Sequence, residues 1–560
     1  MKKSKILILL SLAAIAAGCA LVFAGCKPDS DHGSASADSA SDSFQWITDK
    51  EATCTEAGSK HKECTCCDEI LEQKIIYPKG HNFVGNVCSA CGVTASEGLL
   101  YNFSRDGSGY SVVGIGSCTD KDVVIPSSHQ NLPVTEIGKD AFSHCGIISV
   151  ALPAGVTSIG FCAFSACFSL TSISIPEGLI SIDGAAFAGC SGLTSVSLPD
   201  GLTSIGQSTF YECKGLTSLS LPESLVSIGG SAFSGCNSLT SISIPEGVTS
   251  LGQSTFYDCK SLTSVSLPEG LISIGDWVFH GCDNLANISF PNSLTSIGQG
   301  AFEYCFSLTS LSLPDGLTSI GYGAFSGCGR LTSISIPDGV TSLDCTFNGC
   351  SSLTDISIPD SVTSIGPHAF SRCKKLKNIS IPDSVTSIGF CAFSACFSLT
   401  SISIPDSITS IDSFAFSDCT SLTSITLSDN VTFIGHHSFS SCTSLTSIIL
   451  PDKVVAIIFE AFRGCSGLTS IILPESLVSI GDRAFDGCSA LTSVYYKGTK
   501  AEWDEISIGS TNEALQSATI YYYSETKPPL NGDGTAYDGN YWRYAADGVT
   551  PVIWKKQTAA

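Results

Sequence analysis

Four cysteines near the N-terminus have a spacing that suits metal binding. Cys64 and Cys67 form one Cys-x2-Cys pair and Cys88 and Cys91 form a second, with twenty residues between the pairs. Each pair lets two thiolates reach one tetrahedral ion, so together they have the ligands of a structural zinc site. In a module as short as residues 44–96, a zinc ion would take the place of a hydrophobic core. The spacing therefore predicts a zinc-ribbon-like module.

Disulfide bonds are the alternative chemistry for these cysteines. An exported protein folds in an oxidising compartment, where thiols pair. Cys54, Cys66 and His81 lie nearby and are alternative ligands. Four thiolates would leave no open coordination position for a substrate, so catalysis at such a metal is not expected.

Cys26 is predicted to carry a lipid. A Lys-rich start and an apolar run that reaches Phe23 resemble a secretory signal. The residues Phe-Ala-Gly-Cys that end at Cys26 resemble a bacterial lipobox, and polar sequence begins directly after them. Cys19 ends a rival Ala-Ala-Gly-Cys, but an apolar stretch follows it. An ordinary cleaved signal that leaves a free cysteine is the other alternative.

Sixteen further cysteines mark a repeat. They stand 23 residues apart, except for two intervals of 22. The sixteen are Cys145, Cys167, Cys190, Cys213, Cys236, Cys259, Cys282, Cys305, Cys328, Cys350, Cys373, Cys396, Cys419, Cys442, Cys465 and Cys488. Such a fixed period indicates stacked structural units. We expect these cysteines to be inert core residues, because burial suppresses the reactive thiolate.

Each unit contains one strand pattern. In the unit that begins at Cys190, Leu193, Val196 and Leu198 point to one side of a short strand and hydroxyl residues to the other. A Pro-Asp-Gly turn follows, and Cys213 closes the unit. One unit cannot bury its own apolar side, but stacked copies share a continuous core. The sequence therefore predicts a solenoid of about sixteen rungs at a rise of about 4.8 Å each.

The repeat LTSISIPxxVTSIGxxAFxxC resembles that of the BspA-like leucine-rich repeat surface lipoproteins of bacteria. The resemblance runs from about Val123 to Cys488, and YSVVGIGSCTDKDVVIP before it and AEWDEISIGSTNEALQSATIYYY after it fit the family as well. It implies a leucine-rich-repeat solenoid, mainly parallel β with short helical turns, displayed on a cell surface. It also implies adhesion to host or microbial partners.

Composition restricts the function classes. The chain has 28 Lys and Arg against 51 Asp and Glu, a formal charge of −23. A nucleic-acid partner is not expected, because binding phosphates needs a basic face. An enzyme is not expected either, because catalysis needs an unrepeated constellation and the acids and hydroxyls here recur in register. A column of Pro-Asp and Pro-Glu turns from Glu177 to Glu475 is predicted to be solvated, with divalent cations as the alternative ligands.

The outer strand faces carry Ser and Thr with little variation, which suits weak, multivalent contact. Symmetry breaks where a dense basic patch interrupts the acidic repeats and where Asp or Asn replaces the usual serine. The candidate partner-contact residues there are Asp355, Arg372, Lys374, Lys375, Lys377 and Asn378. A solvated lysine cluster is the alternative interpretation.

The chain is predicted to have six parts. They are residues 1–25, a lipoprotein signal peptide; 26–43, a flexible linker; 44–96, the cysteine-rich module; 97–122, an N-terminal cap; 123–490, the repeats; and 491–560, an aromatic-rich C-terminal cap. We expect an exported protein, lipid-anchored to the bacterial membrane and exposed at the cell surface. It would bind host extracellular-matrix or mucin glycoproteins, or other bacterial surfaces. A passive spacer is the alternative, followed by a metal-handling or enzymatic role for the N-terminal module.

Overall fold

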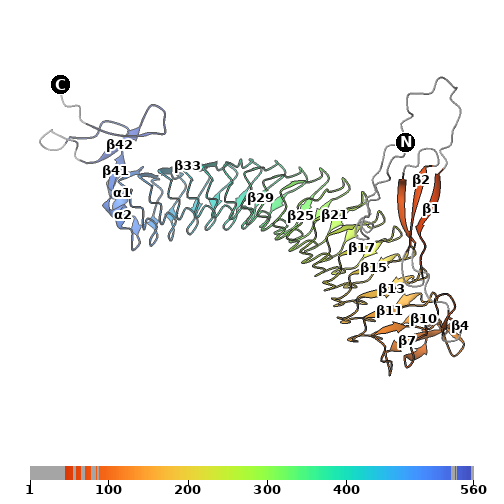
Figure 1. Ribbon diagram of the computed structural model, residues 1–560. Coiled ribbons are helices and arrows are strands. Elements are labelled where there is room, and N and C mark those ends of the chain that lie inside the picture. The colour runs from red at the N-terminus through yellow and green to blue at the C-terminus, as the bar shows by residue number, and fades with distance from the viewer. Residues whose placement is uncertain are drawn as a thin grey trace, which may run out of the picture. The chain divides into compact units, whose positions relative to one another are not determined.

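The computed structural model describes residues 44–53, 58–64, 70–76, 83–84, 87–530, 537 and 539–555. The chain divides into two compact units, Met1–Leu271 and Ile272–Ala560 (Figure 1). Both units are built from stacked rungs, and most rungs contribute two short strands to two parallel ladders; the rungs of β23 (Ser296–Ile297) and β30 (Ser387–Ile388) contribute one strand each. We call these ladders the long-strand face, made of strands of three to five residues, and the short-strand face, made mostly of strands of two residues.

In the first unit the two ladders repeat in step. On the long-strand face, β15 (Ser195–Ser197) pairs in parallel with β17 (Ser218–Ser220) so that Val196 faces Leu219. The other long strands of this unit are β8 (Asp122–Val124), β11 (Ser149–Ala151), β13 (Ser172–Ser174), β19 (Ser241–Ser243) and β21 (Ser264–Ser266). Its short strands are β12 (Ser158–Ile159), β14 (Ser181–Ile182), β16 (Ser204–Ile205), β18 (Ser227–Ile228) and β20 (Ser250–Leu251).

The N-terminal end of the first unit is antiparallel. The short-strand ladder begins with β7 (Tyr110–Gly114) and β10 (Leu132–Ile137), which are parallel, while β6 (Leu100–Phe103) and β9 (Ser128–His129) pair with them antiparallel. Before them, β1 (Phe44–Lys50), β2 (Gly58–Cys64) and β3 (Ile70–Ile76) form an antiparallel sheet, and β4 (Phe83–Val84) pairs with β5 (Val87–Cys88).

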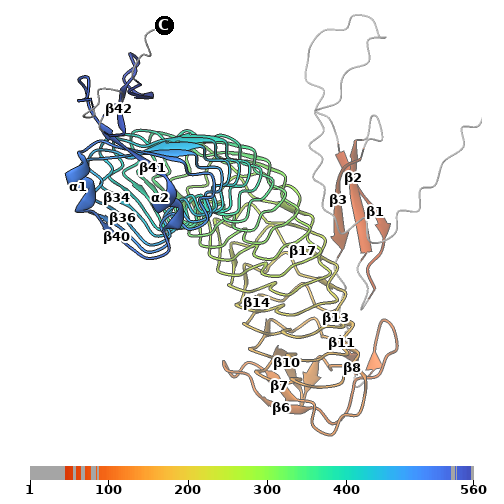
Figure 2. The same cartoon turned by 90° about the vertical axis from the view of Figure 1, so that its left-hand side faces the viewer.

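The second unit continues the same pattern. Its long strands are β24 (Ser310–Ser312), β26 (Ser333–Ser335), β28 (Asp355–Ser357), β31 (Ser401–Ser403), β33 (Ser424–Thr426), β35 (Ser447–Ile449), β37 (Ser470–Leu473), β39 (Ser493–Tyr496) and β41 (Thr519–Tyr523). Its short strands are β22 (Ser273–Ile274), β23 (Ser296–Ile297), β25 (Ser319–Ile320), β27 (Ser342–Leu343), β29 (Ser364–Ile365), β30 (Ser387–Ile388), β32 (Ser410–Ile411), β34 (Phe433–Ile434), β36 (Ala456–Ile457), β38 (Ser479–Ile480) and β40 (Ser507–Ile508). Figure 2 shows β34, β36 and β40 on one side of these rungs and β41 on the other.

A ladder of phenylalanines fills the core between the two faces. In the first unit the rings from Phe142 to Phe256 stack at centroid distances of 5.2–5.6 Å. In the second unit the rings from Phe279 to Phe485 stack at 5.2–6.0 Å. Because each ring packs between its counterparts in the rungs before and after it, the repeat length stays at 22 or 23 residues, which keeps the rings in register.

Rung stacking also brings backbones close together at the end of several short strands. A Cβ added to Gly206 would lie 2.6 Å from the backbone nitrogen of Gly184, in the preceding rung. Glycine is therefore needed there to let the two rungs meet.

The second unit ends in a cap. The helices α1 (Lys500–Asp504) and α2 (Glu513–Ser517) flank β40, and β41 pairs with β39 before β42 (Tyr541–Tyr544) and β43 (Pro551–Ile553) form a hairpin. The capping box of Thr499 and Glu502 starts α1. Trp542 is fully buried and its indole N–H donates to the Tyr496 carbonyl at 3.0 Å, so this side chain docks the hairpin on the last rungs.

The predicted parallel leucine-rich-repeat solenoid with 23-residue repeats is confirmed. The expectation of short helical turns is not met in the described repeats, where hydrogen-bonded turns connect the strands. The helices α1 and α2 both lie in the cap. The AEWDEISI stretch after the repeats begins in α1, and ATIYYY contains β41. The six domain boundaries stay predictions. Within the described ranges, no helix has the length and apolar character needed to span a membrane.

Candidate functional site

Two columns of serines cover the long-strand face. On β24, Ser310 and Ser312 are exposed on either side of buried Leu311, and β26 presents Ser333 and Ser335 in the same register. These four hydroxyls make no hydrogen bond to the described part of the protein. Since neighbouring rungs of a parallel sheet lie about 4.8 Å apart, the columns present rows of hydroxyl groups that are available to a ligand.

The threonine column beside the serines has a different role. The hydroxyl of Thr332 donates to the Thr309 carbonyl in the preceding rung at 2.9 Å, and that of Thr354 donates to the Thr332 carbonyl at 3.3 Å. In the first unit Thr217 donates in the same way to Thr194 at 3.1 Å. The threonines are exposed, yet their protons are already used to link rungs. The serines are therefore the more available donors on this face.

The predicted break in symmetry lies on the long-strand face. Asp355 pairs in register with Ser333, and Asn378 follows in the next rung, where its Oδ1 accepts from the Thr400 hydroxyl at 3.5 Å. Residues 334–335, 355–357 and 378–380 line a shallow, open depression of about 530 Å³. The structure thus brings Asp355 and Asn378, two of the predicted contact residues, together in one depression.

The predicted basic residues are divided between two places. Lys377 takes the place of a threonine beside Asn378, where its N–H donates to the Thr354 carbonyl at 3.4 Å. Lys374 and Lys375 are exposed in the turn before this segment. Arg372 is also exposed, in a left-handed conformation with φ of 61°, and burial together with the charge of Arg372 lowers the pKa of His368. Arg372 therefore lies in a turn at the end of its rung and does not line the depression.

The cysteine ladder is buried, as the sequence predicted, except for Cys145 in the first repeat, which is half-buried. The thiol of Cys190 donates to the Phe164 carbonyl at 3.1 Å, and Cys373 contacts Phe347 in the same way at 3.2 Å. Burial raises the pKa of Cys213 to about 12. These buried thiols thus act as small core groups that also donate to a carbonyl of an earlier rung, whereas Cys145 contacts Ser143 in its own rung.

Two of the four predicted zinc ligands can be placed. Cys88 is buried at the end of β5 and Cys91 is exposed, in a turn closed by the Cys88 N–H donating to the Val93 carbonyl at 2.8 Å. Cys67 lies outside the described residues, as does Cys26, and the side chain of Cys64 is not described. Within the described residues no group of three or more His, Cys, Asp or Glu could hold a metal ion. The zinc site and the lipidation site stay predictions.

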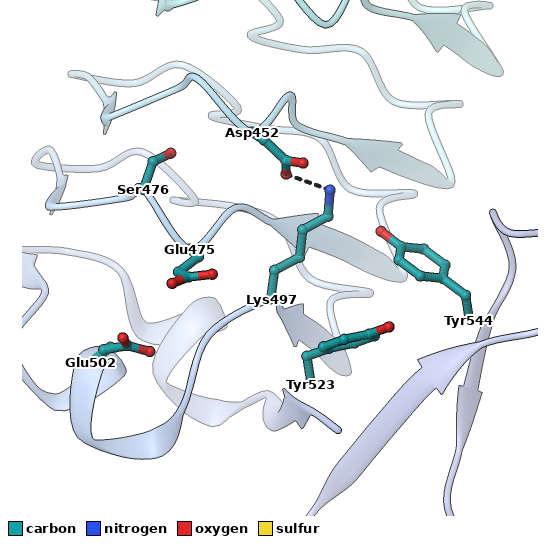
Figure 3. Close-up of a pocket in the computed structure, with 7 residues that line it drawn as sticks. All are labelled: Asp452, Glu475, Ser476, Lys497, Glu502, Tyr523 and Tyr544. Atoms are coloured by element: carbon teal, nitrogen blue, oxygen red, sulfur yellow. Dashed lines mark hydrogen bonds and ion pairs between the residues drawn. The ribbon is translucent and has the colours of Figure 1, made fainter. Parts of the chain in front are cut away.

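A second cavity lies where the acidic turn column meets the C-terminal cap (Figure 3). Its volume is about 620 Å³, and it is lined by Asp452, Glu475, Ser476, Lys497, Glu502, Tyr523 and Tyr544. Sequence reasoning missed this site, because it draws on the ends of rungs, on α1 and on the β42–β43 hairpin. The density of tyrosine and tryptophan after residue 495 was the only indication of it.

These features define a repeat protein whose long-strand face and C-terminal cap each carry an open hollow. Residues 135–263, 227–346, 343–458 and 432–512 match the family model described as the BspA type leucine rich repeat region, in six copies. The chain therefore belongs to the BspA-type leucine-rich-repeat family of bacterial surface-type proteins.

Solved structures of similar proteins are leucine-rich repeat proteins as well. A leucine-rich repeat protein from Bacteroides ovatus is 30% identical, with 76% of this chain and 98% of that chain covered and a TM-score of 0.50. A leucine rich cell surface protein from Faecalibacterium prausnitzii is 26% identical over 75% of this chain and 99% of that chain, with a TM-score of 0.35. Among curated proteins, none matches this chain.

Proposed function

We propose that this protein is an exported bacterial surface adhesin that binds glycoproteins through its long-strand face. The observation that carries the proposal is the pair of serine columns, whose hydroxyls at Ser310, Ser312, Ser333 and Ser335 are exposed and make no hydrogen bond to the described protein. Host extracellular-matrix or mucin glycoproteins, or other bacterial surfaces, present repeated polar groups that such rows fit.

Repetition is the source of affinity in this proposal. Each serine hydroxyl contributes a weak contact of about 0.5–1.5 kcal/mol at most. An extended partner that engages one rung raises the effective concentration of its next group at the next rung, so weak contacts add to useful avidity. Because the face is neutral in most rungs, this mode does not depend on the acidic charge of the chain.

The depression at Asp355 and Asn378 is the local contact that we propose within this face. A carboxylate and an amide there replace hydroxyls, and Lys377 projects from the adjacent column. Lys374 and Lys375 are exposed in the turn that precedes Lys377 and add positive charge there, in a chain whose net charge is −23. An acidic group on the partner would favour this position over other rungs.

Attachment to the cell would come from the N-terminus. We propose that Cys26 carries the lipid, that residues 26–43 form the tether and that a zinc ion or disulfide bonds hold the cysteine-rich module. The proposal assigns no catalytic role to any residue.

A matched pair of variants tests the serine columns. One variant carries Ser→Ala at Ser310, Ser312, Ser333 and Ser335, and the control carries Ser→Ala at Ser296, Ser319, Ser342 and Ser364 on the short-strand face of the same unit. Binding of each full chain to immobilised mucin and to matrix glycoprotein is measured by surface plasmon resonance. We expect the long-strand variant to bind at least about fivefold more weakly and the control to bind like the parent. Equal effects of the two variants would contradict the proposal.

A passive surface spacer is the second candidate function. The threonine hydroxyls that donate to the preceding rung, such as Thr332 to Thr309, favour it, because they show polar surface residues serving rung stability. A folded chain that binds no host or bacterial surface at any salt concentration would support the spacer.

A further inference from the structure

The cavity of about 620 Å³ at the C-terminal cap has no part in the adhesion proposed above. It gathers side chains from two acidic turns, the segment after β39, helix α1, strand β41 and the hairpin. In Figure 3 the carboxylates of Glu475 and Glu502 lie on one side of the Lys497 stem, and the rings of Tyr523 and Tyr544 lie on the other.

One cation already occupies part of this cavity. The Lys497 ammonium group lies 2.5 Å from the Asp452 carboxylate and 6.0 Å from the ring centroid of Tyr544. Burial lowers the pKa of Lys497, but Asp452 and Tyr544 more than offset that effect and raise it. An ammonium group held by a carboxylate and a tyrosine ring is therefore the arrangement that the cavity itself displays.

Within the described part of the chain, the other two carboxylates of the cavity form no ion pair with a cation. No hydrogen bond or ion pair is found for the Glu475 side chain among the described residues. Glu502 accepts from the N–H and hydroxyl of Thr499 at 2.7 and 2.9 Å, and these bonds lower its pKa, so it stays ionised. The Tyr496 hydroxyl donates to the Glu475 carbonyl at 3.3 Å, and Glu475 and Glu502 both line the cavity. Burial raises the pKa of Tyr496, and the charges of the two carboxylates raise it further.

The charge count of the cavity favours a positive ligand. Asp452, Glu475 and Glu502 carry three negative charges and Lys497 carries one positive charge, which leaves the cavity at −2. Lys497 is paired with Asp452, so the excess charge sits at Glu475 and Glu502.

We propose that this cavity is a binding site for a primary ammonium or guanidinium group, which Glu475 and Glu502 hold as Asp452 holds Lys497. Two sources fit this chemistry: a Lys or Arg side chain of a partner protein, and a small free amine. An anionic ligand is disfavoured by the charge, and a neutral sugar would not depend on the charge of Glu475.

Saturation-transfer NMR and calorimetry with the full chain test the proposal. The probes are n-butylammonium chloride, the peptide acetyl-Gly-Arg-Gly-amide and the same peptide with neutral citrulline in place of arginine. We expect both cationic probes to bind and the citrulline peptide to bind at least about tenfold more weakly. A tighter complex with the arginine peptide than with butylammonium assigns the site to a partner side chain, and the reverse order assigns it to a free amine.

Three variants locate the site. Glu475→Gln should weaken cation binding by about threefold to fivefold, the size expected for one exposed charge pair. Lys497→Met should tighten it by a similar factor, because the competing cation is removed. Glu223→Gln, at an exposed position of the same acidic column in the first unit, is the control and should change nothing. Glu502 is not substituted, because its side chain is part of the capping box that stabilises α1.

The Lys497→Met variant distinguishes cation binding, which should become tighter, from the binding of a sugar or an anion. A sugar or anion that uses the Lys497 ammonium as a donor would bind more weakly after that substitution. Equal binding of the citrulline peptide, no effect of Glu475→Gln, or no binding of either cationic probe at millimolar concentration would each overturn the proposal. None of these variants touches the serine columns, so the result is independent of the adhesion test.

Discussion

Substitution of Phe370 by alanine tests how the rungs hold together. Phe370 is fully buried, and its ring centroid lies 5.6 Å from that of Phe347 and 5.4 Å from that of Phe393. Truncating a buried phenylalanine to alanine lowers the free energy of unfolding by about 3–5 kcal/mol, because hydrophobic transfer energy is lost and a cavity is left behind. In a repeat protein this cost falls on the rung itself and on its nearest neighbours.

Hydrogen exchange read by mass spectrometry resolves this local effect. A loss of about 3 kcal/mol raises the population of the open state by about a hundredfold, so amides in the rungs of Phe347, Phe370 and Phe393 should exchange at least about a hundredfold faster. The matched control is Phe306→Ala, because Phe306 is 48% exposed and surface substitutions usually change stability by about 0.5 kcal/mol or less. Similar exchange in the two variants would refute the shared phenylalanine core.

The remaining predictions concern the cysteines. Because burial raises the pKa of Cys213 to about 12, only about one thiol in ten thousand is ionised at pH 8, so iodoacetamide should label it in the denatured chain but not in the native one; equal labelling would contradict its burial. Cys26→Ser should abolish incorporation of a fatty-acid analogue and release the protein to the soluble fraction, whereas retained label would assign the lipid to Cys19. The purified chain should contain about one zinc ion, lost in a Cys88→Ser, Cys91→Ser double variant; a metal-free chain whose mass rises on reduction would show disulfides instead.

The repeat fold could be predicted because its information is periodic. A fixed interval between cysteines sets one register for every rung, so the pairing of Asp355 with Ser333 follows from counting residues. The same counting places Asn378 one rung further on. In a solenoid, the repeat pattern along the sequence also determines which residues pair between neighbouring rungs.

The use of the hydroxyl groups could not be predicted in this way. Thr354 and Ser357 both point to solvent in the strand pattern, and only the geometry of neighbouring rungs reveals that the Thr354 hydroxyl donates to the Thr332 carbonyl. The basic patch is contiguous in sequence, but a turn separates Arg372 from Lys377 in space. A residue run therefore predicts a shared surface only where no turn interrupts it.

The C-terminal cavity was beyond sequence reasoning because it has no period. Its residues extend from Asp452 to Tyr544, and the docking of Trp542 on the Tyr496 carbonyl is what brings the hairpin next to the acidic turns. Aromatic density indicated a packed region there, but it gave no information about which carboxylates face it.

Deletion of whole rungs tests most directly the claim that function lies in binding by the repeated surface. Removing residues 191–213, and then also residues 397–419, deletes one 23-residue repeat each time, with Ser195 and Ser401 in it. Because these serines pair in register with Ser218 and Ser424, the following rung can take the same register beside the rung before the deletion. Binding of the chains to immobilised mucin or matrix glycoprotein should fall in steps as rungs are removed, while circular dichroism stays that of a folded solenoid. Unchanged binding after both deletions, together with complete loss when Lys374, Lys375 and Lys377 are neutralised, would contradict the distributed surface and assign binding to the basic residues alone.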